Sequence, residues 1–252
     1  GHKAFAADKT VDEETYILTL AAMARELSFR NLTEAKVLLA VGLPLTWVST
    51  QKEQFKAYLC RNRRISFTFR GKNYSIEIVG AEVFPQGFAA VAQNLSEFKG
   101  TNMLCDIGNG TMNILMIQDR KPVAGKMFTE KYGTHQCMLM AKEAVMRTYH
   151  VAVPESIVTE VLRYGTADIR KDILETIRQT AGSYVDEIFH ILYDHEYSPE
   201  LMKLHIIGGG GCLIRNFAEV DSSRVKILSD ICATAKGYEY MAEMVLRKRD
   251  RA

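Results

Sequence analysis

Residues 103–117 read MLCDIGNGTMNILMI, and this stretch decides the fold. Two apolar runs, 103–107 and 112–117, flank a short segment that contains two glycines. Apolar runs of this length that are bounded by glycine are typical of buried strands. The stretch therefore predicts two strands joined by a tight Gly-rich turn, with the carboxylate of Asp106 at the end of the first strand.

The residue types in this turn suit phosphate chemistry. Gly108 and Gly110 carry no Cβ, so the backbone N–H groups of the turn can approach phosphate oxygens, and Thr111 adds a hydroxyl. Asp106 can hold hydrated Mg²⁺, which needs only one or two carboxylates beyond the phosphates. The alternative is a tight hairpin in which Asp106 only stabilises the turn. The motif alone leaves both interpretations open.

A second glycine motif lies at residues 206–212, IIGGGGC. Four consecutive glycines cost conformational entropy, so their place after an apolar strand suggests a backbone that closely approaches a flat ligand, such as a nucleotide base and ribose. A flexible connection is the weaker alternative, because Leu213 and Ile214 follow at once. The motif is neither the G-x-G-x-x-G dinucleotide pattern nor a Walker loop.

The rest of the chain alternates between helical and strand patterns, which predicts an α/β fold. We expect strands at 35–41, buried on both faces, and at 202–207, and a hairpin at 65–79 with its turn at 70–73. We expect helices at 12–28, 51–59, 88–95, 133–149, 154–161, 167–193 and 233–249.

Composition excludes several classes of protein. The 252 residues are 47% hydrophobic and 25% charged, the balance of a globular chain with room for two domains. A net charge of +2 gives no overall attraction for nucleic acid or acidic membranes, and no apolar run is long enough to span a bilayer. The odd number of cysteines without C-x-x-C spacing predicts reduced, mostly buried thiols in a cytoplasmic protein: Cys60, Cys105, Cys137, Cys212 and Cys232.

The two glycine motifs together resemble those of the actin-like ATPase superfamily. The stretches 43–46 (LPLT) and 84–87 (FPQG), in the same order along the chain, are similar to the ParM (StbA) branch of plasmid-segregation actins, and the match covers nearly the whole chain. The resemblance implies an α/β, actin-like (ribonuclease H-like) two-domain ATPase fold with mixed sheets flanked by helices. Domain I would contain residues 1–99 plus 232–252, and domain II residues 100–231.

The resemblance also implies roles for individual residues. Gln86 would orient the attacking water, and Asp106 would act in catalysis and bind the metal. Asn113 departs from the family, which often has an acid there. Residues 133–136 would approach the nucleotide, and Glu155 and Glu160 are candidates for ribose or base contacts by position only. The alternatives are a polar residue at a helix start for Gln86, a plain N-terminal helix residue for His135, and a solvated acidic face for Glu155 and Glu160. The nucleotide-binding set would be Asp106, Gly108, Asn109, Gly110, Thr111, Gly133, Glu155, Gly208, Gly209, Gly210 and Gly211.

The superfamily's first phosphate loop, Asp-x-Gly-x-x-x-x-Lys, is not found in these residues. The chain begins Gly-His-Lys without Met, so we expect that it was trimmed upstream rather than that the loop was lost naturally. This polypeptide by itself would then bind nucleotide weakly or be inactive.

The implied function is polymerisation driven by ATP (or GTP) and Mg²⁺ into filaments that segregate plasmid DNA in the cytoplasm. A ParR-type DNA-binding adaptor would be the partner, with no direct contact to nucleic acid or membrane. Two alternatives stay open: a non-catalytic actin-like scaffold, and a small-molecule kinase of the same superfamily. The kinase would need a further carboxylate as base, and no Asp stands convincingly at a strand end for that role.

Overall fold

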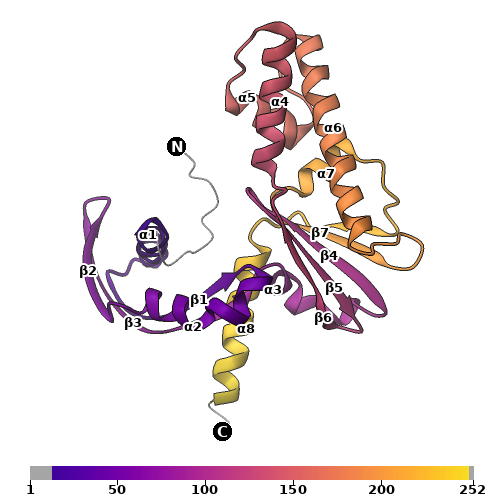
Figure 1. The fold of residues 1–252 in the computed structure, drawn as a ribbon. Helices are drawn as coiled ribbons and strands as arrows, with labels where there is room; N and C mark the ends of the chain where they lie inside the picture. The colour runs from indigo at the N-terminus through magenta and orange to yellow at the C-terminus, as the bar shows by residue number, and fades with distance from the viewer. Residues whose placement is uncertain (1–12, 250–252) are drawn as a thin grey trace. The chain divides into compact units, whose positions relative to one another are not determined.

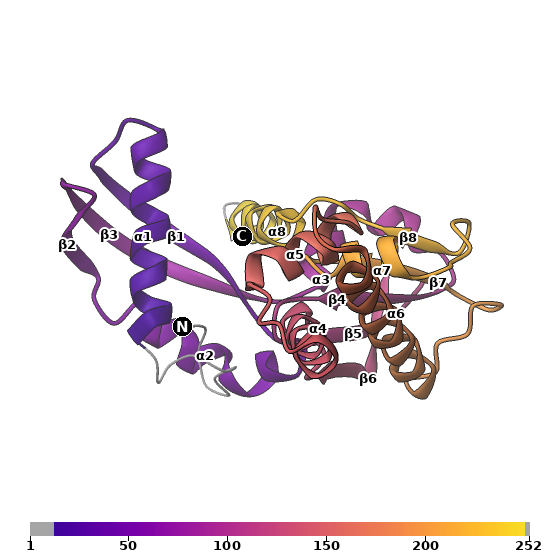
Figure 2. The same cartoon turned by 90° about the horizontal axis from the view of Figure 1, so that it is seen from above.

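The computed structural model describes residues 13–249, which form two compact units (Figures 1 and 2). Unit 1 consists of Gly1–Pro85 and Tyr238–Ala252, and unit 2 of Gln86–Gly237. That these units correspond to actin-like domains I and II stays a prediction.

Unit 1 is built on a three-stranded sheet in the order β1-β3-β2. Strand β1 (Glu34–Leu43) runs parallel to β3 (Lys72–Pro85), and β2 (Arg64–Phe69) is antiparallel to β3. Helices α1 (Glu13–Phe29) and α2 (Val48–Leu59), the latter preceded by the 3₁₀ turn η1 (Leu45–Trp47), bury apolar residues in the same core as the sheet. The long α8 (Ala233–Arg249) ends in this unit.

Three expectations about the first 97 residues need correction. Strand β1 is not buried on both faces. Its buried residues are Leu39, Gly42 and Leu43, and its first half carries the exposed side chains of Glu34 and Lys36. The hairpin turn is only the pair 70–71, since residues 72 and 73 already pair with β2. The helix expected at 88–95 is the short α3 (Phe88–Val91) followed by the 3₁₀ segment η2 (Ala92–Glu97), in which Asn94 leaves helical geometry. Asp12, the expected start of the first helix, lies outside the described residues.

Unit 2 contains a mixed five-stranded sheet in the order β6-β5-β4-β7-β8. The strands are β4 (Thr101–Ile107), β5 (Met112–Gln118), β6 (Lys121–Glu130), β7 (Lys203–Ile207) and β8 (Val225–Ile227). β4 and β5 form the hairpin that residues 103–117 predict, and β7 and β8 add in parallel to β4. The helices are α4 (Thr134–Tyr149), α5 (Glu155–Tyr164), α6 (Lys171–Asp194) and α7 (Gly211–Phe217).

The sequence patterns did not indicate β6, β8 or α7. Pro122 and Gly125 interrupt the apolar pattern of β6, and an edge strand tolerates both residues. β8 has three residues, and α7 has seven and begins inside the glycine run. Elements this short have no periodicity to detect.

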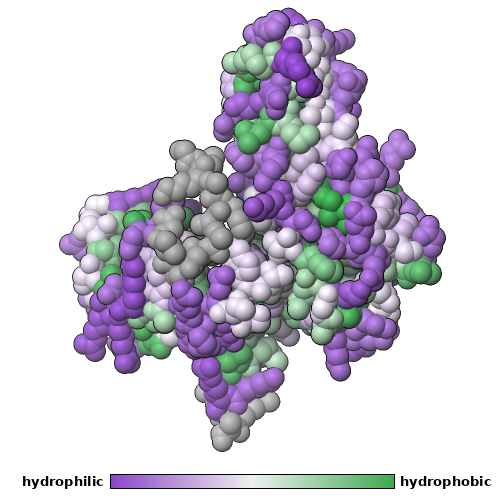
Figure 3. All heavy atoms as spheres, in the orientation of Figure 1, coloured by the Kyte–Doolittle hydropathy of each residue, from purple (hydrophilic) through white to green (hydrophobic). Residues whose placement is uncertain are grey.

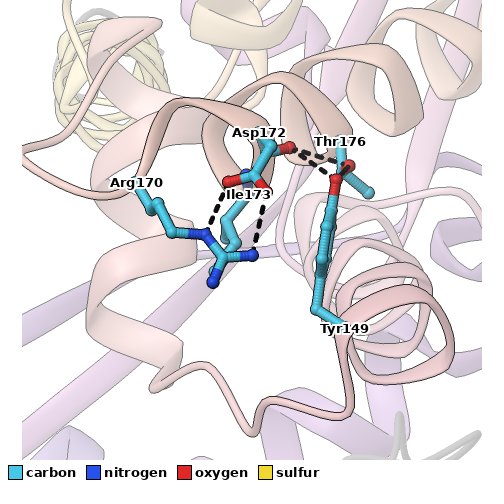
Figure 4. Close-up of polar contacts among 5 residues, drawn as sticks. All are labelled: Tyr149, Arg170, Asp172, Ile173 and Thr176. Atoms are coloured by element: carbon cyan, nitrogen blue, oxygen red, sulfur yellow. Dashed lines mark hydrogen bonds and ion pairs between the residues drawn. The ribbon is translucent and has the colours of Figure 1, made fainter.

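The end of α4 is joined to the start of α6 by a group of polar contacts (Figure 4). Tyr149, the last residue of α4, donates its hydroxyl hydrogen to the Asp172 carbonyl at 3.2 Å and lies 3.2 Å from the Thr176 hydroxyl. Arg170 donates hydrogen bonds to the Asp172 carboxylate from Nε at 2.7 Å and from Nη2 at 2.8 Å. This hydrogen bonding lowers the pKa of Asp172. α4 is thus fixed at the end opposite Gly133.

The face of the protein shown in Figure 3 is mostly polar, and the five cysteines differ in exposure. Figure 3 shows polar residues over most of the face that it draws, with apolar residues in small separate groups. No helix in the described range 13–249 combines the length and the apolar character needed to cross a membrane. All five cysteines are free, but only Cys105 and Cys137 are buried, so the expectation of mostly buried thiols is wrong. Cys60 and Cys212 are half-buried, and Cys232 is exposed.

Candidate functional site: two glycine turns around Asp106

The turn that joins β4 to β5 is held by the first residues of α4. Within the turn, the Gly108 N–H donates to the Thr111 carbonyl at 2.8 Å. The backbone N–H groups of Thr134 and His135, which have no acceptor inside their own helix, donate to the carbonyls of Gly108 at 3.0 Å and Asn109 at 2.9 Å. The helix therefore satisfies its first donors with the carbonyl side of the turn.

Gly133 and Gln136 secure the same turn from the side. A Cβ on Gly133 would lie 2.7 Å from the Gly110 nitrogen and closer still to the Asn109 carbonyl, so only glycine fits. The Gln136 side-chain amide donates to the Gly110 carbonyl at 3.1 Å, and its oxygen accepts from the Gly133 N–H at 3.0 Å. Sequence reasoning named Gly133 but missed Gln136. Its signal is a Gln three residues after a helix cap, as in a capping box.

Two backbone N–H groups of this turn differ from that of Gly108, which is bonded within the turn. The backbone N–H groups of Asn109 and Gly110 have no hydrogen-bond acceptor in the described part of the chain. Successive N–H groups in such a turn form a concavity suited to an anion. The phosphate-binding interpretation of this turn stays a prediction, beside the alternative of a simple hairpin.

Asp106 lies where three segments of unit 2 converge. It pairs in register with Asn113 on β5 and with Ile207 on β7. Gly208 follows β7 with φ +83°, and a Cβ there would lie 2.5 Å from Asp106 Oδ1 and 2.6 Å from the Ile107 carbonyl oxygen. Burial in this cluster raises the pKa of Asp106 to about 6.

The second glycine run forms an ordered turn against the first. The Gly210 N–H donates to the Ile107 carbonyl at 2.8 Å, and the Gly211 N–H donates to the Gly208 carbonyl at 3.2 Å at the start of α7. Around a Cβ built on Gly209, no atom lies within 4 Å. The run thus joins the two motifs, 102 residues apart in sequence, at Asp106 and Ile107.

The other predicted residues divide into two groups. A Cβ on Gly87, the residue after Gln86, would lie 3.4 Å from Asp106 Cβ, and the catalytic role of Gln86 stays a prediction. Asn113 is buried and accepts a hydrogen bond from the Thr129 hydroxyl at 2.9 Å. Glu155 instead begins α5 and forms an ion pair with Lys142 at 3.4 Å, and Glu160 is exposed on the same helix. Among the described residues, no polar contact joins Glu155 or Glu160 to the glycine turns.

The residues at the site set limits on a metal. Within residues 13–249 there is no group of three or more His, Cys, Asp or Glu side chains that could hold an ion. Asp106 would supply one hard oxygen donor beside a turn with two unbonded backbone N–H groups, which fits Mg²⁺ held by one carboxylate, water and phosphate rather than a closed protein site.

Comparison with known proteins agrees with this geometry. Residues 1–88 match the family model described as "Actin like proteins N terminal domain". No curated protein sequence matches the chain significantly. Solved structures do match. The structure of apo pSK41 ParM has 17% sequence identity and a TM-score of 0.70, and the match covers 98% of this chain and 76% of that protein. The ADP complex of Ta0583, an archaeal actin homologue, matches at 20% identity and TM-score 0.71 over 92% and 78%.

A third match, the actin-like protein Alp7A, has 14% identity and a TM-score of 0.72 over 97% of this chain and 78% of its own. Identities this low establish the fold, and the family model independently identifies the N-terminal third. The mixed sheets with flanking helices are those that the resemblance implies. The chain has the fold of ParM and related bacterial actin homologues, and its residues 1–88 match the actin-like N-terminal family model.

Proposed function

We propose that this protein is a ParM-like actin that binds and hydrolyses ATP or GTP with Mg²⁺ and polymerises into filaments for DNA segregation. One observation carries the proposal: in an actin-like fold, the two glycine turns meet at the half-buried carboxylate of Asp106, beside two unbonded backbone N–H groups. Relatives support it, since one solved structure is an ADP complex and another is the Alp12 filament.

Each part of the site has a definite role in the proposal. The N–H groups of Asn109 and Gly110 bind the β- and γ-phosphates, with Gly108 and Thr111 shaping the turn. Gly208–Gly211 approach the nucleoside, where Gly209 leaves open space. Gln86 orients the attacking water, because a neutral amide can position water in line with the phosphate without acting as a strong base. Gly133 is a supporting residue, and Glu155 is the weakest member of the set.

Mg²⁺ would neutralise the charge that develops on the phosphates. Asp106 would hold its water shell and must be ionised to do so. Since burial raises the pKa of Asp106 to about 6, nucleotide binding and hydrolysis should weaken as the pH falls below that value.

The partner and location of the proposal follow the family. A ParR-type adaptor would link filament ends to DNA in the cytoplasm, and the net charge of +2 agrees with indirect contact to DNA. A non-catalytic actin-like scaffold is the second candidate, since its filaments would need no turnover. A small-molecule kinase would instead transfer the γ-phosphoryl group to a substrate hydroxyl, which gives up its proton, and leave the nucleoside diphosphate.

The test combines sedimentation with phosphate release, using ATP–Mg²⁺ and GTP–Mg²⁺ on the full-length protein. Nucleotide should drive sedimentation, and Asp106→Ala should slow phosphate release by about a hundredfold, as expected for loss of a core phosphoryl-transfer group. Asp168→Ala, an exposed aspartate of the same unit, is the matched control and should leave both readouts unchanged.

Two outcomes contradict the proposal. Filaments that form equally well without nucleotide would identify a scaffold. If neither nucleotide changes sedimentation and no phosphate appears, the protein is not a polymerising nucleotidase, and a kinase assay with small hydroxyl substrates follows.

A further inference from the structure

One cavity of the described chain does not involve the glycine turns. It has a volume of about 700 Å³ and lies in unit 2, between the C-terminal half of α6, the connection from α6 to β7 and the connection from α7 to β8. Figure 1 shows α6 running beside the chain that follows α7. A volume of this size is that of a small-molecule site.

Aromatic rings form one part of the cavity wall. Phe189 and Tyr193 come from α6, and Tyr197 follows that helix. Tyr193 and Tyr197 stack with ring centroids 5.8 Å apart and an interplanar angle of 11°. Tyr193 is half exposed. Such ring faces attract ammonium groups through the negative potential of the π system.

Tyr197 carries a polar atom that the fold leaves unused. Its side chain is only 5% exposed and lines the cavity, yet its hydroxyl has no hydrogen-bond partner in residues 13–249. Burial, with the charge of Glu200 among the smaller causes, raises the pKa of this phenol, so it stays neutral. A neutral phenol oxygen can accept a hydrogen bond from a cationic N–H donor.

Four carboxylates from three segments line the same cavity: Asp186 on α6, Glu200 before β7, and Glu219 and Asp221 after α7. None of them forms an ion pair with a cation of the described chain. Glu200 accepts a hydrogen bond from the Ser198 hydroxyl and Asp221 from the Ser223 N–H. Arg224 is the one cation in the wall, with a hydrogen bond to the Glu200 carbonyl at 3.2 Å, and His190 also faces it.

We propose that this cavity binds a small organic polycation of the aliphatic polyamine class, independently of the nucleotide site. The ammonium groups would bind the carboxylates on the two sides and the Tyr197 oxygen, while the methylene chain packs on the tyrosine rings. A bare divalent ion is disfavoured, because it gains nothing from aromatic walls. An inorganic anion is excluded by the four carboxylates.

The test is calorimetric titration of the full-length protein with spermidine, without nucleotide, at fixed ionic strength. Asp186→Asn with Glu219→Gln should weaken binding by about tenfold or more, since two carboxylates of the cavity wall lose their charge. Tyr193→Leu keeps an apolar side chain of similar bulk on the half-exposed position and should weaken binding about threefold or more through loss of the ring face. Glu187→Gln, on α6 beside Asp186 but outside the cavity wall, is the matched control and should bind as the parent does.

Three results would overturn the proposal. The first is no binding of spermidine by the folded parent, with folding checked by circular dichroism. The second is equal weakening in the Glu187→Gln control, which would indicate general charge attraction. The third is competition by Mg²⁺ at the same charge concentration together with no effect of Tyr193→Leu. Nucleotide-driven sedimentation of the cavity variants tests the proposed function separately.

Discussion

Two hairpin turns of this protein both contain glycine, but glycine is required for a different reason in each. In unit 1, Arg70 and Gly71 join β2 to β3 with φ values of +50° and +77°, and a Cβ on Gly71 would contact nothing within 4 Å. In unit 2, the Gly108–Thr111 turn is enclosed by α4, Gly133 and the second glycine run. The first turn needs Gly71 because of its positive φ. The second turn needs glycines outside itself, at positions 133 and 208, because the backbone of these segments lies against the turn and Asp106.

Adding one methyl group to each region tests this difference with the largest expected effect. Gly133→Ala should lower the free energy of unfolding by about 3 kcal/mol or more, because the new Cβ meets rigid backbone of the Asn109–Gly110 peptide. Gly71→Ala should cost only about 1 kcal/mol, the strain of a left-handed alanine in open space. Urea denaturation measures both, and equal losses would contradict the comparison.

A second prediction concerns the charge that the enclosed turn surrounds. The native pKa of Asp106 is raised to about 6, above the unfolded value of about 3.9, so ionising this carboxyl opposes folding. Its contribution to the free energy of unfolding falls as the pH rises from about 4 to about 6, by about 2–3 kcal/mol in total. Asp106→Asn has no carboxyl to ionise, so its free energy of unfolding does not fall with pH in this way. Without nucleotide, the variant should therefore be more stable than the parent at pH 7.

Denaturation of both proteins at pH 4, 5, 6 and 7 checks this prediction. The stability difference between them, rather than either curve alone, isolates Asp106. A difference that stays constant across this range would show that the carboxyl is not destabilised by burial. Asp168→Asn, at an exposed position of the same unit, provides a flat reference.

A third prediction sharpens the role of the side-chain support. Gln136→Ala removes two hydrogen bonds that secure Gly110 and Gly133, so it should lower the free energy of unfolding by about 1–2 kcal/mol. Gln179→Ala removes one exposed bond to Glu175 on α6 and should cost less than about 0.5 kcal/mol. Thermal and urea denaturation distinguish them, and a Gln136 variant as stable as its control would mean that the turn supports itself.

The smallest effect is expected beside the open turn. Thr68 donates its hydroxyl hydrogen to the Asn73 side chain at 2.7 Å across the β2–β3 hairpin, at an exposed position. Thr68→Val keeps the β-branched shape that strands favour, so the free energy of unfolding should change by less than about 0.5 kcal/mol. A loss above about 1 kcal/mol in urea denaturation would show that this hairpin depends on side-chain contacts after all.

The predictability of the fold followed the length and periodicity of each segment. The β4–β5 hairpin, the strand before the second glycine run and the helices α4 and α6 all have long patterns, and the structure confirms them. β6, β8 and α7 were missed because Pro122 and Gly125 or sheer shortness removes the pattern. At the site, the glycines and Asp106 were visible as motifs, whereas Gln136 and Tyr184, which donates its hydroxyl hydrogen to the Gly133 carbonyl at 2.7 Å, were not.

The sequence by itself determined the α/β class, the two glycine turns and the carboxylate between them, because these depend on local residue types and spacing. Only the tertiary structure decided that both turns meet at Asp106, and that α4 uses its first N–H groups on the carbonyls of one turn. It also decided that four carboxylates and stacked tyrosines share one cavity. The physical reason is that such contacts join residues far apart in the chain, whose proximity depends on the packing of the whole sheet and its helices.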